Sequence, residues 1–214
     1  MTHHNSYAPR LTAVLLFAIA MAFVEAAVVV YLRELFYPDG FTLPLKALPT
    51  RFIAVEIARE AATLIMLGTV AVIAGCSRWD RFGWFIIAFG TWDIFYYLWL
   101  KATLDWPGSL FDWDILFLIP VPWIGPVVAP VTVAFLMVVF GIVITRRFSS
   151  GRFFRPTAVA WTAALLGSGI ILYSFMSDTA ATLRSAQPQP YPYYLLAVGL
   201  LCYIGGFIHA IRKN

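Results

Sequence analysis

The chain has 214 residues, of which 61% are hydrophobic and only 12% are charged, and its net charge is +4. Because soluble domains carry about 25% charged residues, this composition excludes a soluble protein and indicates an integral membrane protein whose first partner is the lipid bilayer. The basic balance does not indicate a nucleic-acid-binding protein, since membrane topology accounts for the positive charges.

Six apolar runs are long enough to cross about 30 Å of hydrocarbon, which takes about 20 helical residues. The first run is longer than the apolar core of a signal peptide, so we expect it to be retained as a helix. The six runs cover residues 11–36, 52–75, 82–104, 124–145, 157–176 and 193–211. They predict an all-α fold, a six-transmembrane-helix bundle that forms a single polytopic membrane domain over residues 1–214.

The basic residues between the runs predict the orientation of the bundle. With the N-terminus inside, the cytoplasmic segments hold Arg10, Arg78, Arg81, Arg146, Arg147, Arg152, Arg155, Arg212 and Lys213, and the outer loops hold Lys46, Arg51 and Arg184. Because Lys and Arg accumulate on the cytoplasmic side, both termini are expected in the cytoplasm. We expect a multi-pass protein of a cell membrane, with a bacterial inner membrane as the leading candidate.

The segment between the third and fourth runs is irregular. It contains Pro120, Pro122, Pro126 and Pro130, which exclude one continuous helix. We expect a short interfacial helix near 110–118, then a break before the fourth span. Since irregular backbone at membrane depth is tolerated only against protein or a wet cavity, one alternative is a lid over the charged residues described next. The other alternative is an amphipathic helix anchored at the headgroups by tryptophans.

Eight charged residues lie inside the first three apolar runs, and the last three runs have none. They are Glu25, Arg33, Glu34, Glu56, Arg59, Glu60, Asp93 and Lys101. A charge at the bilayer centre costs about 2.5–3.5 kcal/mol on insertion scales, so these side chains must pair, face water or hold a ligand. The predicted topology places them at mid-depth or in the outer half of the membrane. A functional site is therefore expected where the first three helices meet.

Seven of these residues form the candidate polar cluster. Arg33 and Glu34 are adjacent and point in different directions, so at least one of them is expected to leave the cluster. The candidate cluster is Glu25, Arg33, Glu56, Arg59, Glu60, Asp93 and Lys101. One interpretation is a buried ion-pair network that fixes helix register. The other interpretation starts from the eight intramembrane charges, in which five acids exceed three bases. This excess suits a proton relay or a hard-cation site, and Glu25 and Asp93 are the deepest candidates for it.

Motifs for cofactors and catalysis are missing from the membrane segments. The only histidine near an apolar run is His209, and His3 and His4 lie in the N-terminal tail. No HExxH, nucleophile-elbow or phosphate-loop motif occurs. The sequence therefore predicts no haem or cofactor-binding residues and no histidine-ligated zinc, and leaves open whether the carboxylates bind another metal. The pattern favours a protein that is not an enzyme.

Three functional hypotheses follow. The leading one is a non-catalytic integral membrane subunit of a larger complex, such as an energy-converting one, with other membrane subunits as partners. It rests on the missing motifs, the 17% aromatic residues and the small residues spaced four apart in the last two runs, for example Ala163 and Gly167.

The second hypothesis is a small transporter or a proton or cation pathway that uses the intramembrane carboxylates. The third is an intramembrane lipid-modifying enzyme. Its acid and base would be Glu56 or Glu60 with Asp93, and Arg59 or Lys101 would hold a headgroup phosphate.

Overall fold

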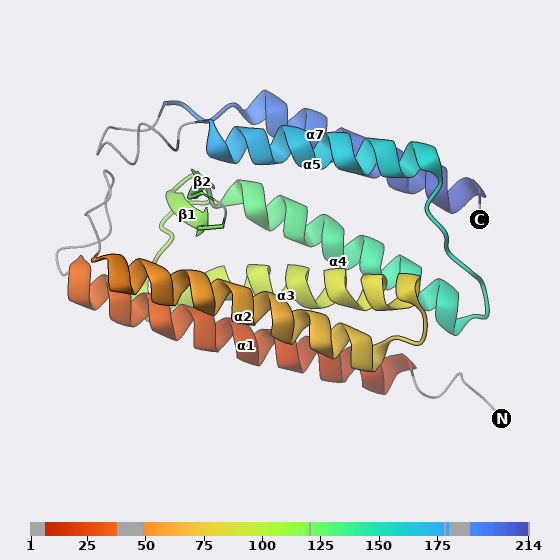
Figure 1. The fold of residues 1–214 in the computed structure, drawn as a ribbon, viewed down its shortest axis with the longest axis horizontal. Helices are drawn as coiled ribbons and strands as arrows, with labels where there is room; N and C mark the ends of the chain where they lie inside the picture. Colours follow the sequence, from red (N-terminus) through yellow and green to blue (C-terminus); the bar gives the residue numbers. More distant parts are fainter. Residues whose placement is uncertain (1–6, 38–48, 120, 178, 180–188, 214) are drawn as a thin grey trace.

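A computed structural model of the chain describes residues 7–37, 49–119, 121–177, 179 and 189–213. Long helices dominate this part of the chain, and one small hairpin interrupts them (Figure 1). The elements are α1 (Tyr7–Phe36), α2 (Thr50–Ala74), α3 (Arg78–Leu104), β1 (Trp113–Phe117), β2 (Trp123–Pro126), α4 (Val128–Ser149), α5 (Ala158–Met176) and α7 (Tyr193–Lys213).

Each of the six predicted apolar runs corresponds to one helix. Five of these helices, α1, α2, α4, α5 and α7, are long and apolar enough to cross a membrane. The chain is thus a multi-pass membrane protein by the length and composition of its helices. The remaining helix, α3, is 27 residues long, is rich in aromatic residues and carries Asp80, Asp93 and Lys101.

The start of α3 is set by a local capping pattern that extends the predicted third run toward the N-terminus. The Ser77 hydroxyl accepts the backbone N–H of Asp80 at 3.4 Å, and the Asp80 carboxylate accepts the backbone N–H of Cys76 at 2.9 Å. Such reciprocal bonds satisfy N–H groups that have no partner within the helix. They explain why α3 begins at Arg78 and not at residue 82, directly after the end of α2.

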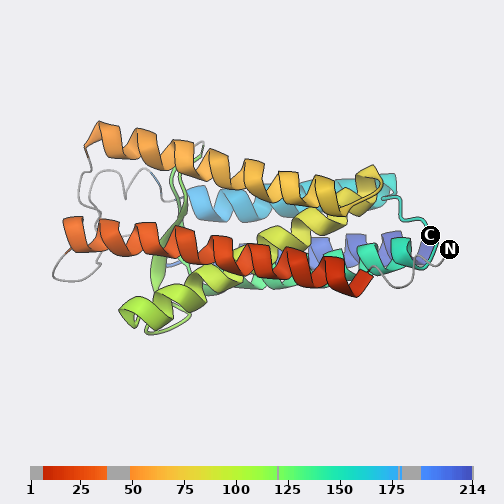
Figure 2. The same cartoon turned by 90° about the horizontal axis from the view of Figure 1, so that it is seen from below.

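The helices form two groups. α1, α2, α3 and α4 lie together, and α5 and α7 lie side by side as a separate pair (Figure 1). Turning the molecule shows that α3 starts beside α2 and crosses α1 obliquely (Figure 2). α1 begins and α7 ends at one end of the bundle, here called the proximal end. The opposite end, where α1 ends and α7 begins, is the distal end.

Small residues allow the closest helix contacts. A Cβ atom added at Gly206 of α7 would lie 2.8 Å from the Cβ of Ala163 in α5, and one added at Gly141 of α4 would lie 2.6 Å from the Gly83 oxygen of α3. Both additions would force the helices apart. The small-residue faces of α5 and α7 therefore pack against each other within the chain.

The interfacial helix predicted near 110–118 is wrong, because these residues include strand β1 of an antiparallel hairpin. The fourth helix accordingly begins at Val128 and not at residue 124. Pro122 directly precedes β2 and Pro126 is its last residue, and both disfavour a helix there, while Trp123 and Ile124 between them suit extended backbone. Pairing the two strands satisfies the backbone groups on their facing edges.

The hairpin lies between the two groups of helices (Figure 1). Its register pairs Asp114 with Gly125, and the pairing shifts in the second half of β1. Trp113 and Leu116 pack in a cluster with Phe175 of α5. Asp114, by contrast, belongs to the wall of a cavity beside α1, α2 and α3. The hairpin thereby connects the α5–α7 pair to the charged residues of the first three helices.

Candidate functional site

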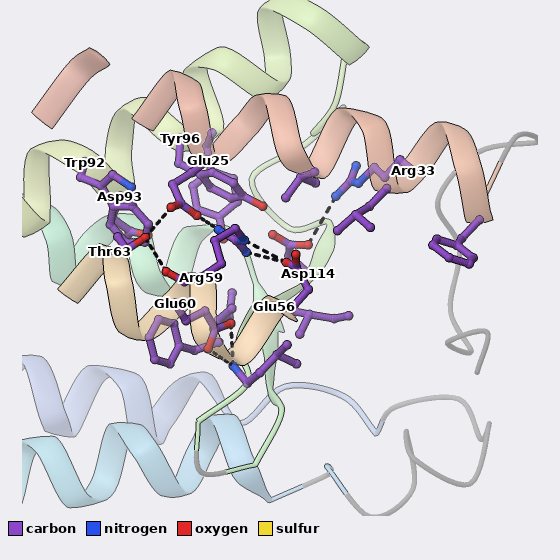
Figure 3. Close-up of a pocket in the computed structure, with 18 of the residues that line it drawn as sticks. Glu25, Arg33, Glu56, Arg59, Glu60, Thr63, Trp92, Asp93, Tyr96 and Asp114 are labelled. Atoms are coloured by element: carbon purple, nitrogen blue, oxygen red, sulfur yellow. Dashed lines mark hydrogen bonds and ion pairs between the residues drawn. The ribbon is translucent and has the colours of Figure 1, made fainter. Parts of the chain in front are cut away.

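A polar cavity of about 170 Å³ lies between α1, α2, α3 and the hairpin, toward the distal end (Figure 3). Glu25, Arg59 and Asp93 each lie roughly 15 Å from the distal end of their helix, at about 1.5 Å per residue. Three separate helices thus deliver charged groups to one level of the bundle. Six of the seven predicted residues line the cavity: Glu25, Arg33, Glu56, Arg59, Glu60 and Asp93.

Arg59 is the centre of the first ion-pair group. Its guanidinium forms an ion pair with Glu25 of α1 and donates to Glu56 of its own helix from Nε at 3.0 Å and Nη2 at 2.7 Å. The Thr63 hydroxyl donates to Glu25 and also lies 3.1 Å from the Arg59 carbonyl oxygen. Glu25 is only 2% exposed, so this pairing supplies the compensation that a buried carboxylate needs.

Glu60 has a different partner, which comes from the hairpin. Both of its carboxylate oxygens accept the backbone N–H of Leu118 at 3.0 Å. Leu118 directly follows β1, where the cross-strand ladder has ended. The carboxylate therefore replaces a missing backbone partner and ties α2 to the hairpin, a charge-assisted contact in a buried environment.

Arg33 and Asp114 form the second ion-pair group. Arg33 Nη2 lies 3.4 Å from Asp114 Oδ1, and the guanidinium carbon of Arg33 lies 3.8 Å from the centre of the Trp106 ring. Both charged side chains are at most about one-tenth exposed. Burial raises the pKa of Asp114 to about 6, against the opposing effect of Arg33.

Several polar groups in the cavity wall are not satisfied by described residues. Asp93 forms no hydrogen bond or ion pair with any residue that the structure describes. Asp114 Oδ2 and Trp92 Nε1 are buried without a hydrogen-bond partner. Tyr97 lies near Asp114 and lowers the pKa of its carboxyl, against the larger effect of burial. Since buried polar atoms are normally hydrogen-bonded, these groups indicate that the cavity takes water or a ligand.

Lys101 and Glu34 lie outside the cavity. Lys101 is half-exposed and forms an ion pair with Asp105 at 2.7 Å, and its hydrogen bond lowers the pKa of that carboxyl. Lys101 is two turns from Asp93 and rotated by roughly 80° about the α3 axis, so its long side chain reaches the helix end instead. Glu34 is exposed and Arg33 is buried, so of this adjacent pair only Arg33 lines the cavity.

The cavity is more acidic than the sequence indicated. Lys101 is outside it and Asp114 is inside, so five carboxyl groups face two guanidinium groups. If all ionise, three negative charges are uncompensated. In the described part of the chain, no three His, Cys, Asp or Glu side chains are grouped so that they could hold one metal ion.

Asp114 and the aromatic wall are the parts that sequence analysis missed. Asp114 lies in the stretch that was expected to form an interfacial helix, between the apolar residues Trp113 and Ile115, and an acid flanked in this way signals burial against a partner. The other polar or aromatic lining residues outside the predicted cluster are Phe36, Tyr37, Thr63, Trp92, Tyr96, Tyr97 and Phe117.

A second cavity, of about 390 Å³, lies between the α3–α4 and α5–α7 helices. Its lining is aliphatic and aromatic, with Ser168 and Tyr203 bonded to each other at 2.9 Å. Among the described residues, no charged side chain lines it. The charged cavity is therefore the better candidate for chemistry that involves protons or ions.

Comparison of the chain with protein-family models, with curated proteins and with solved structures finds no match.

Proposed function

We propose that this chain is a small transporter or a proton or cation pathway that uses the carboxylates of the charged cavity. The observation that carries the proposal is Asp93, a carboxyl group without a hydrogen-bond or ion-pair partner among the described residues, at the deep level of an acidic cavity. A purely structural ion-pair network would be expected to pair this group, because an isolated charge inside a membrane protein is costly. A proton or a cation supplies the missing compensation.

The same proposal includes the membrane topology. α3 crosses together with the other five long helices, which gives six spans with both termini in the cytoplasm and the cavity in the outer half. Within the described residues, α3 packs against α1, α2 and α4 along the bundle, so its central part with Asp93 faces protein and the cavity. This burial explains how a helix with Asp93 is tolerated in a membrane.

Arg59 provides the competing charge inside the cavity. It holds Glu25 and Glu56, and a cation that enters near Asp93 would weaken this pairing by attracting the same carboxylates. Loading the cavity would thereby loosen the contact between α1 and α2. Such a coupling between ligand and helix contact is what a transporter needs to change conformation.

The other two hypotheses have less support from the geometry. The small-residue faces that motivated a subunit of a larger complex pack within the chain. A lipid-modifying enzyme would need a positive site for a phosphate, but Lys101 lies outside the cavity and Arg33 and Arg59 are engaged by carboxylates. An acidic cavity repels a phosphate headgroup.

The test is ion flux into liposomes that contain the purified protein. A pH-sensitive dye inside the liposomes reports proton entry under an imposed potential, and external Na⁺ or K⁺ gradients test cations. Asp93→Asn should lower the flux at least tenfold. Asp105→Asn, which changes an exposed acid outside the cavity, should leave it unchanged. Flux in Asp93→Asn equal to wild type, or none in wild type above protein-free liposomes, would remove the proposal.

A further inference from the structure

The charged cavity has hydrogen-bond acceptors that lack donors. Asp93 has no partner among the described residues, and Oδ2 of Asp114, a residue only 4% exposed, is also unpartnered. The two guanidinium groups of the cavity are engaged elsewhere, Arg59 with Glu25 and Glu56 and Arg33 with Asp114 Oδ1. One unpartnered donor, Trp92 Nε1, lies in the same wall, and a single N–H cannot satisfy both carboxyl groups, so a ligand that completes this site must bring further hydrogen-bond donors.

A bare metal ion fits the arrangement poorly. Calcium and magnesium need several oxygen atoms that converge at about 2.0–2.6 Å from one point. The described acidic side chains form no such group. An ammonium group differs, because its N–H donors diverge and reach separate acceptors at about 2.7–2.9 Å. Carboxylates that line a cavity without converging suit this second kind of cation.

Aromatic rings form part of the same wall. Trp92 and Tyr96 stack with ring centres 6.4 Å apart, and Tyr96 and Tyr97 meet edge to face at 5.0 Å. All three line the cavity beside Asp93. Indole and phenol rings attract organic cations through their π faces, which adds to the attraction by carboxylates.

The lining of α1 indicates the shape of the ligand. Glu25, Val29, Leu32, Arg33 and Phe36 all line the cavity and recur at helical spacing along one face. From Glu25 to Phe36 this face is about 16 Å long at 1.5 Å per residue. The cavity is thus acidic at its deep end and has Val29, Leu32 and Phe36 along its wall toward the distal end.

We infer that the ligand of this cavity is an organic ammonium ion that carries at least one N–H group and a short apolar chain. Its N–H groups would donate to Asp93 and Asp114, and its chain would lie along the apolar face of α1. This inference rests on the proposed function in that it assigns the cation of the same cavity. It goes beyond that function by excluding quaternary ammonium and metal ions as the preferred ligands.

The test is isothermal titration calorimetry on the full chain in nanodiscs, with empty nanodiscs to subtract partitioning into lipid. The probes are methylammonium, propylammonium and butylammonium, with tetramethylammonium, 1-pentanol and MgCl₂ as comparison ligands. Affinity should rise about fourfold for each added methylene, as expected for burying an apolar chain. Tetramethylammonium should bind at least tenfold more weakly than butylammonium, and 1-pentanol and Mg²⁺ should not compete with it.

Variants locate the binding. Asp93→Asn should weaken butylammonium binding at least tenfold, and Asp105→Asn should bind as wild type does. The comparison of ligands on the wild-type chain needs no variant, so it tests the ligand assignment even if Asp93→Asn does not fold. Equal affinity for butylammonium and tetramethylammonium, or no butylammonium binding above empty nanodiscs, would overturn the inference.

The two proposals fail separately. Ammonium binding without flux of protons, Na⁺, K⁺ or butylammonium into liposomes would support the ligand assignment and remove the transport function. Proton flux that depends on Asp93 without ammonium binding would support the proton pathway and overturn the ligand assignment.

Discussion

Arg59 is the residue on which the electrostatics of the cavity depend most. Its one side chain compensates both Glu25 and Glu56, which come from different helices. These carboxylates are 2% and 8% exposed, so neither has water as a full substitute. Removing one member of a buried pair leaves an uncompensated charge and typically costs about 3–5 kcal/mol.

Arg59→Gln should therefore lower the unfolding temperature of the detergent-solubilised protein markedly. Arg51→Gln is the matched control, because Arg51 is an exposed residue near the start of the same helix and outside the cavity. Adding Glu25→Gln to Arg59→Gln should restore part of the loss, since the double change removes the buried charge as well as its partner. A melting temperature of Arg59→Gln as high as that of Arg51→Gln would show that Glu25 and Glu56 do not depend on Arg59.

At the scale of elements, the hairpin depends on a contact between segments far apart in the sequence. Glu60 of α2 accepts the N–H of Leu118 just beyond β1. Without this acceptor the N–H would lose its partner beside a cavity. Hydrogen bonds to charged groups contribute about 1.5–3 kcal/mol, so the contact is strong enough to hold the end of β1 in place.

Glu60→Ala should increase hydrogen–deuterium exchange in peptides that cover residues 113–126 by at least tenfold. Glu60→Gln keeps a carbonyl acceptor for Leu118 and should retain most of the protection. Glu34→Ala, which changes an exposed acid of α1, should have no effect on this segment. Unchanged exchange in Glu60→Ala would mean that strand pairing alone holds the hairpin.

The helices could be predicted from the sequence, and the hairpin could not. Apolar runs of about 20 residues have one stable form in a bilayer, so each predicted run became a helix. The charges in the first three runs also indicated where a cavity lies. A short apolar run such as residues 113–117 does not distinguish strand from helix by itself. Its form depends on pairing with β2 and on Glu60, and Asp114 enters the cavity only as a consequence.

For the whole molecule, the two ends of the bundle differ in their charged groups. Arg10, Arg146 and Arg147 lie at the proximal end, where α1 begins and α4 ends. Arg10 contacts the Ala74 carbonyl at the end of α2, and Arg147 contacts the Ile211 carbonyl near the end of α7, so these arginines also compensate helix C-termini. In the topology proposed above, the positive-inside rule would place the proximal end in the cytoplasm and the charged cavity in the outer half of the membrane.

Thiol labelling in intact cells tests this orientation, because the exposed Cys76 marks the proximal end of the bundle. In a Cys202→Ala background, a membrane-impermeant maleimide should label Cys76 only after the membrane is permeabilised. Replacing Cys76 by Ala and Ser109 by Cys moves the single thiol to the exposed segment between α3 and β1, which should be labelled without permeabilisation. This pair of results also requires α3 to cross the membrane, since residues 76 and 109 lie on either side of it. Labelling of both positions from the same side would show that α3 does not cross. The carboxylate cavity would then border the interface, and a pathway through the membrane would need a different route.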